Sequence, residues 1–159
     1  MGSAEAYMQG SMRRAYFARR IKADPTSKLA IWAFRVFAPG PVRSPMLSVS
    51  IAGAGTARFD DLNADVLRFD ISGAGEGQLT GQVQSLSLGV SGKGKVTADQ
   101  LRVGTASVSI SGVANAELWV TDTLRVDISG AGHVGYWGQP KVRQSISGLG
   151  SVDPRGEKR

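Results

Sequence analysis

His133 is the single histidine of the chain, and the chain has no cysteine. An imidazole could act as a general base or as a metal ligand, but a zinc site needs several converging nitrogen or thiolate ligands. His133 follows a glycine-rich turn, and the residues at the same place after the equivalent turns are Thr56, Glu76, Lys95, Asn115 and Ser151. A position that accepts such different polar side chains points to solvent, so we predict neither a catalytic residue nor a metal site.

Carboxylates could cleave a polysaccharide if two of them were held at a fixed separation. Asp60 and Asp61 are adjacent, and Asp70 and Asp127 occupy equivalent places in the repeats described below. The repeats between those two have glycine or serine at that place, so solvated faces explain these acids better than a catalytic cluster. A polysaccharide-active enzyme on the same scaffold is kept as an alternative, with Asp60, Asp61 and Glu76 as the residues to change.

The runs GAGEG (73–77) and GKGK (92–95) resemble phosphate-binding loops. Such a loop needs a following helix whose N-terminus faces the anion. Here a strand pattern follows each run, and the same glycines recur where no lysine does. Turn geometry explains the glycines, because a residue without Cβ can adopt positive φ. We therefore predict no cofactor.

These turns belong to a repeat that runs through most of the chain. A Ser-Gly or Ala-Gly pair preceded by isoleucine or valine occurs six times, at spacings of 20, 19, 20, 18 and 18 residues. The turn glycines are Gly53, Gly73, Gly92, Gly112, Gly130 and Gly148, and the residues two places before them are Ile51, Ile71, Val90, Ile110, Ile128 and Ile146. Apolar residues also stand four and six places before nearly every glycine, which describes a strand with one buried face. We expect a second short strand after each turn, followed by a polar linker.

Two short strands in about 20 residues cannot bury a core alone, but stacked copies can, with each strand paired to its copy above. The repeat therefore predicts an all-β fold, a parallel β-solenoid (β-helix) with 18–20 residues per repeat and about five to six rungs. Right-handed coiling follows from the general preference of crossover connections. A β-sandwich is the alternative, but it gives no reason to repeat the same side chains at the same spacing.

Three regions are predicted: residues 1–37 as a leader, residues 38–152 as the solenoid domain and residues 153–159 as a charged tail. The net charge of +6 lies in residues 1–43 and the remainder is neutral, so we predict no nucleic-acid partner. The apolar run of residues 29–38 is too short to span a bilayer. The leader is interpreted as a strand or helix that covers the first layer, where Trp32, Phe34 and Val36 alternate, as a degenerate export signal, or as a disordered basic segment.

Aromatic residues depart from the repeat in its fourth and fifth copies. Trp119, Tyr136 and Trp137 lie near one corner in successive layers. An aromatic ledge of this kind binds sugars or protein partners. The interpretation that we favour from the sequence is simpler: these rings pack against the tail or cover the last layer.

The segments ISGAG, VSGKG and ISGVA, and above all residues 128–152 (ISGAGHVGYWGQPKVRQSISGLGSV), resemble the bacterial head GIN domain family (auto-transporter adhesin, DUF2807). The likeness covers residues 38–152, and the closing turn carries Tyr136, Gly138 and Pro140 in the order typical of that family. The resemblance implies a β-helical domain that is secreted or associated with the cell envelope, and it supplies no catalytic residue.

Together these features predict a non-enzymatic solenoid with a binding, adhesin-like or structural role, whose partner is a glycan or an envelope protein. One alternative is the polysaccharide-active enzyme named above. Another is an end-to-end polymer, because the terminal layers of a solenoid expose unpaired backbone groups that favour self-association.

Overall fold

The computed structural model describes residues 16–17, 27–31, 35–38 and 42–158. Within these residues every regular element is a β-strand, and all the strands join one sheet by parallel pairing. The strands are β1 (Tyr16–Phe17), β2 (Ser27–Ile31), β3 (Arg35–Ala38), β4 (Val42–Ile51), β5 (Ala54–Ile71), β6 (Ala74–Val90), β7 (Lys93–Ile110), β8 (Val113–Ile128), β9 (Ala131–Trp137), β10 (Lys141–Ile146) and β11 (Leu149–Gly156).

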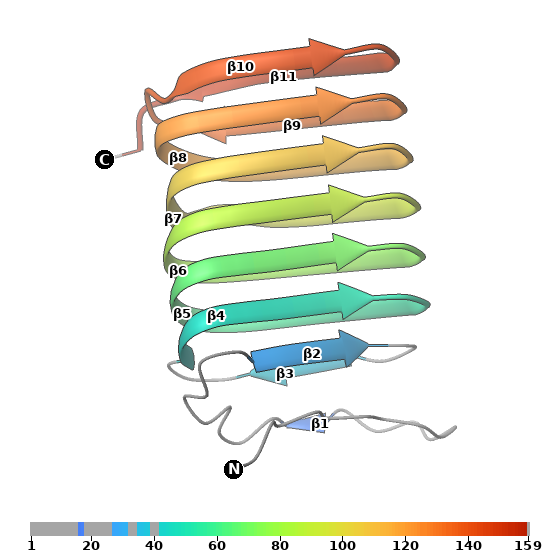
Figure 1. Cartoon of the computed structure of the whole chain (residues 1–159), viewed down its shortest axis with the longest axis vertical. Coiled ribbons are helices and arrows are strands. Elements are labelled where there is room, and N and C mark those ends of the chain that lie inside the picture. Colours follow the sequence, from blue (N-terminus) through green and yellow to red (C-terminus); the bar gives the residue numbers. More distant parts are fainter. Residues whose placement is uncertain (1–15, 18–26, 32–34, 39–41, 159) are drawn as a thin grey trace.

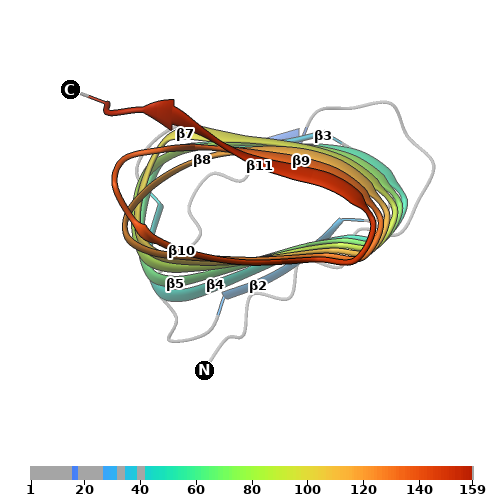
Figure 2. The same ribbon diagram turned by 90° about the horizontal axis from the view of Figure 1, so that it is seen from above.

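The strands wind into a solenoid of about six turns (Figure 1). Seen from above, each coil is a flattened oval with two long faces and two corners (Figure 2). The chain runs counter-clockwise in that view while it rises toward the viewer, so the coil is right-handed. The prediction of a parallel, right-handed β-solenoid is confirmed.

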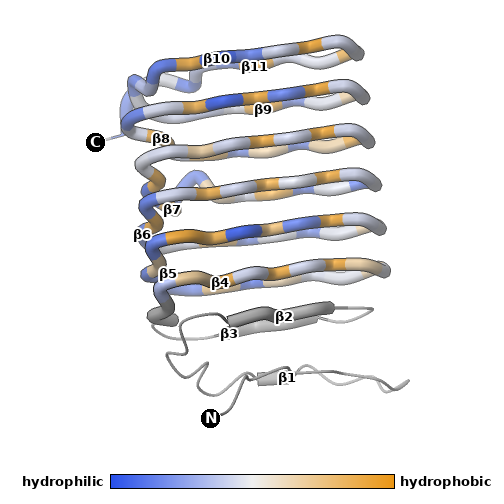
Figure 3. Tube along the Cα trace, viewed as in Figure 1, coloured by the Kyte–Doolittle hydropathy of each residue, from blue (hydrophilic) through white to orange (hydrophobic). Residues whose placement is uncertain are grey.

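Equivalent residues of successive coils lie directly over one another. The isoleucine or valine that precedes each turn glycine pairs with its copy in the next coil, in the order Ile51, Ile71, Val90, Ile110, Ile128 and Ile146. All of them are buried except Ile146 in the last coil, whose exposed fraction is 37%. Figure 3 shows apolar positions recurring at the same places along successive coils. The predicted inward column is therefore present.

The core fills the space between the two long faces. Side chains alternate between buried and exposed along β5 to β8, as a strand with one face on a core requires. Phe59 and Phe69 are the largest fully buried side chains and come from opposite halves of β5. Burying a side chain of this kind contributes about 1.5–3 kcal/mol relative to leaving it in water.

The turn glycines are required for a different reason from the one predicted from sequence. Positive φ was expected at these turns, but in the described residues it occurs at Asp61, Gly81, Gly138 and Gly156. At Gly112, a Cβ atom would lie 2.0 Å from the carbonyl oxygen of Gly92 in the coil below. That same oxygen accepts a hydrogen bond of 2.8 Å from the Val113 amide. Close approach of two backbones therefore demands glycine here, and the prediction of positive φ was wrong.

The second corner of each coil also differs from expectation. We expected a polar linker between two short strands, but β5, β6, β7 and β8 each continue around this corner as one strand of 16 to 18 residues. The pairing changes register there, for example between Phe59 and Leu62 of β5. A bulge bends a strand while most of its hydrogen bonds persist, which is why the corner does not end it.

Part of the region predicted as a leader joins the solenoid. β2 pairs in parallel with β4, which places Ile31 under Ile51, and β3 pairs with β5. Trp32, Phe34 and most of the basic residues of the predicted leader lie outside the described residues. Among the residues that are described, no helix has the length and apolar character needed to cross a membrane.

Candidate functional site

Two tryptophans lie on the outside of the second corner in adjacent coils. Trp119 of β8 pairs with Trp137 of β9 in the parallel register. Trp119 stands between the fully buried residues Leu118 and Val120, so the alternation of the strand turns its ring away from the core. Four large apolar side chains of the described residues are exposed, but none of them is aromatic: Met46, Val113, Ile146 and Leu149.

Tyr136 does not share this surface. It pairs with Leu118, which is fully buried, and its ring packs against the core cluster. The three aromatic residues predicted as a ledge are therefore divided. Trp119 and Trp137 face outward together, and Tyr136 faces inward.

Asp99 reaches the same corner from the coil below. The pairing of β7 with β8 jumps from Ala98–Leu118 to Arg102–Trp119, so the three residues from Asp99 to Leu101 form a bulge. The bulge corresponds to the change in glycine spacing from 20 to 18 residues at this point of the sequence. We call the surface formed by Asp99, Trp119 and Trp137 the aromatic corner.

The C-terminal tail crosses the aromatic corner. After β11 the chain leaves the coil and passes outside β7 and β8 (Figure 2). The amide of Gly138 donates a hydrogen bond of 2.8 Å to the carbonyl oxygen of Gly156. The side chain of Gln139 donates to the carboxylate of Glu157. The tail is thus attached to the loop that follows Trp137.

Lys158 places its ammonium group over the two indoles. Its Nζ lies 6.0 Å from the centre of the Trp119 ring and 5.4 Å from that of Trp137. The same nitrogen donates to the carbonyl oxygen of Asp99 and lies 3.2 Å from the carboxylate oxygen Oδ2 of Asp99. Ring faces attract cations, and the carboxylate adds a charge partner. The aromatic corner can therefore hold a cation.

The indole nitrogen of Trp137 is buried and has no hydrogen-bond partner among the described residues. Tryptophan N–H groups usually find a partner when they are buried.

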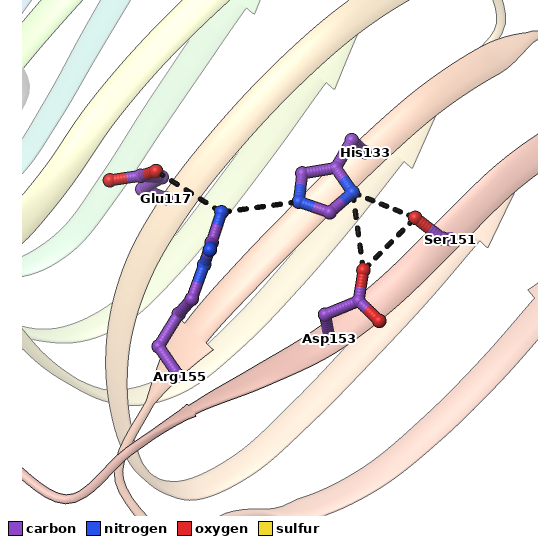
Figure 4. Close-up of polar contacts among 5 residues, drawn as sticks. All are labelled: Glu117, His133, Ser151, Asp153 and Arg155. Carbon is purple, nitrogen blue, oxygen red and sulfur yellow. Dashed lines mark hydrogen bonds and ion pairs between the residues drawn. The ribbon is translucent and has the colours of Figure 1, made fainter.

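A second polar cluster connects β8, β9 and β11 (Figure 4). The Nδ1 atom of His133 lies 2.7 Å from the Ser151 hydroxyl oxygen and 3.2 Å from Oδ2 of Asp153. Arg155 lies 3.3 Å from Nε2 of His133 and 3.6 Å from the carboxylate of Glu117. These contacts fasten β11 to the two preceding coils.

This cluster contains serine, histidine and aspartate but not in the arrangement of a catalytic triad. An arginine guanidinium can only donate hydrogen bonds. Nε2 of His133 therefore accepts a hydrogen bond from Arg155, and the ring proton lies on Nδ1. The Ser151 hydroxyl donates to Asp153 at 3.1 Å, so histidine does not accept its proton. A triad needs histidine as the acceptor of the serine proton. The cluster is suited to holding strands together.

The acidic residues considered from sequence are dispersed over the surface. Asp70 and Asp127 each pair with an arginine two residues earlier, at 2.8 Å for Arg68 and 3.2 Å for Arg125. The hydrogen bond to Asp70, with attraction between the charges, raises the pKa of the Arg68 guanidinium. Asp60 pairs with Arg58 in the same way. Within the part of the chain that is described, three or more metal-binding side chains nowhere come together.

The glycine runs once compared with phosphate-binding loops are followed by strands. β6 begins at Ala74 and β7 begins at Lys93, so a strand stands where such a loop would need a helix.

The chain has a counterpart among known protein families. No curated protein matches the chain. A sequence model of the family described as "Putative auto-transporter adhesin, head GIN domain" matches residues 29–140. The match begins within β2 and ends just after Trp137, so it includes the aromatic corner and leaves out β10, β11 and the tail. The chain therefore belongs to the head GIN domain family, DUF2807.

Proposed function

We propose that this protein is a non-enzymatic binding domain of the cell envelope and that it contacts its partner through the aromatic corner. The description of the family as an adhesin and the solenoid fold are both compatible with a role in binding at a surface. Solenoids present extended rigid faces that many binding proteins use.

The observation that carries the proposal is the pairing of Trp119 with Trp137 on the outside of adjacent coils. Paired strands stand about 4.8 Å apart, so the two rings form one continuous surface on a rigid support. Tryptophan is enriched among the residues that dominate binding energy at protein interfaces. Nearby, the cluster of His133 and Ser151 lacks the hydrogen bonding of an acyl-transfer site, which favours binding over catalysis.

Changing both tryptophans to alanine (W119A/W137A) is expected to reduce binding to isolated bacterial envelope fractions by about tenfold or more, the loss expected when a central aromatic anchor is removed. The measurement is the retention of purified full-length protein on immobilised envelope fractions and on an array of bacterial polysaccharides. Val113→Ala is the matched control, because Val113 is an apolar side chain 54% exposed at the opposite, glycine corner of the coil.

The control is expected to bind like the unchanged protein. Equal retention of W119A/W137A and the unchanged protein would show that the aromatic corner is not the contact surface. Release of new reducing ends from any polysaccharide on the array would instead support the enzyme alternative.

A further inference from the structure

We propose that the aromatic corner recognises the primary ammonium group of a lysine side chain in a partner protein, and that Lys158 occupies this site when no partner is bound. This inference rests on the proposed function and deepens it, because it names the chemical class of the ligand. The contacts of Lys158 show how the corner would hold the ammonium group of a partner lysine.

The contacts of Lys158 match an ammonium group. Its nitrogen meets two oxygen acceptors of Asp99, the backbone carbonyl and Oδ2, and two ring faces. An ammonium group is compact and carries three rotatable donors, so it can meet acceptors and rings in different directions. A guanidinium is a planar fork that prefers two parallel bonds to one carboxylate. The contacts made at the corner are therefore those of an ammonium group.

The recognition site belongs to the body of the solenoid. Asp99, Trp119 and Trp137 come from β7, β8 and β9, three successive coils joined by parallel pairing. Lys158 is 59 residues from Asp99 in the sequence and arrives after the last strand. The backbones of Trp119 and Trp137 are held by strand pairing without the tail, and Asp99 follows Ala98, which pairs with Leu118.

Strand pairing of the tail ends at Gly156, and beyond it the described part of the tail makes its contacts through the Glu157 and Lys158 side chains. Gly156 has a φ of +110°, and a Cβ atom there would have nothing within 4 Å. Beyond it, Glu157 is exposed and contacts the exposed residue Gln139. Because Lys158 is tethered to the site, it competes with a partner lysine at an effective concentration on the order of millimolar. A partner lysine must therefore replace Lys158.

A glycan fits the corner less well. Sugars bind tryptophan by lying against the face of the ring, and the ammonium group of Lys158 lies over the faces of both rings. An aspartate beside two indoles adds negative charge, which favours a cation over a neutral sugar. We therefore take a lysine-bearing protein segment as the ligand.

The test is a titration of the full-length chain with the peptide acetyl-Gly-Glu-Lys-Gly-amide, followed through the indole N–H resonances of Trp119 and Trp137. Lys158→Ala vacates the site, so this variant is expected to bind the peptide about fivefold or more tightly than the unchanged protein. Lys93→Ala removes the same charge at the glycine corner and is expected to change nothing. Adding Asp99→Asn to Lys158→Ala is expected to remove the gain, and the peptide with an acetylated lysine is expected not to bind.

Two results overturn the inference: equal binding by Lys158→Ala and the unchanged protein, or equal binding of the lysine and acetyl-lysine peptides. If the peptide fails while W119A/W137A still loses envelope binding, the ligand class is wrong and the proposed function stands. If the peptide binds Lys158→Ala tightly while W119A/W137A keeps full envelope binding, the corner recognises lysine and the proposed function is wrong.

Discussion

Replacing Gly112 by alanine is expected to lower the free energy of unfolding by about 3 kcal/mol or more, at the upper end of the cost of overpacking. The new Cβ atom would lie 2.0 Å from the carbonyl oxygen of Gly92. That oxygen is held by the Val113 amide, and Gly92 itself stands equally close to Gly73, so the backbone has no direction in which to move. Urea unfolding followed by far-ultraviolet circular dichroism measures the change.

Gly135→Ala is the matched control for this substitution. A Cβ atom at Gly135 would meet the Nε atom of Arg155 at 2.8 Å, and that atom belongs to an exposed side chain rather than to the backbone. Moving Arg155 aside gives up only its exposed contacts with His133 and Glu117, so the expected loss is about 1 kcal/mol. Losses of equal size at Gly112 and Gly135 would contradict the view that close stacking of the turns requires glycine.

Replacing Phe69 by alanine is expected to cost about 4 kcal/mol, within the range measured for buried phenylalanine. Phe69 is fully buried, and its ring fills the space over Gly77, where a Cβ atom would lie 2.8 Å from Cζ of the ring. The loss combines the burial of the ring with the cavity that remains. The same unfolding measurement applies.

The contact between Phe69 and Gly77 can be tested by combining substitutions. Gly77→Ala alone is expected to cost about 2 kcal/mol, because the ring has no room to move in a packed core. In the Phe69→Ala background the same change is expected to cost nothing or to stabilise, which gives a coupling of at least about 2 kcal/mol. An identical cost in both backgrounds would show that the ring does not explain the glycine.

The stacking of the coils was predictable because two patterns in the sequence indicate the same fold, the alternation within each strand and the repeat of about 18–20 residues. Alternation along each strand indicates one buried face, and the recurrence of Ile71, Ile110 and Ile128 indicates that copies lie over one another. The reason for the glycines was not predictable, because positive φ and close approach both select glycine. The continuous second corner was also missed, since a polar linker looks the same whether the strand ends or bulges there.

The aromatic corner was predicted in part. Trp119 and Trp137 were identified from residue type and position, but Tyr136 was grouped with them although it shares an inward position with Leu118. Asp99 and Lys158 were not identified, because they are brought together only by the path of the tail. The drop in repeat length at the fourth coil was the one signal of the Asp99 bulge.

Of the polar cluster that connects β8, β9 and β11, the sequence predicted only that His133 and Ser151 occupy equivalent positions in successive repeats. His133 and Ser151 were placed at equivalent positions, and the structure pairs them. Their contacts with Asp153 and Arg155 depend on side-chain orientations that the repeat does not encode.

Paired cysteines test the direct stacking of equivalent residues, on which the aromatic corner and the core both depend. The chain has no cysteine of its own, so each introduced pair is unambiguous. Lys95 and Asn115 face solvent and are partners in the register of β7 and β8, whereas Thr97 pairs with Glu117. A disulfide needs Cα atoms within about 7 Å, which neighbouring in-register residues satisfy and residues displaced by two positions do not.

After mild oxidation, mass spectrometry is expected to find the disulfide in K95C/N115C and not in T97C/N115C. Equal cross-linking of both pairs, or cross-linking of the second pair alone, would contradict the stacked solenoid.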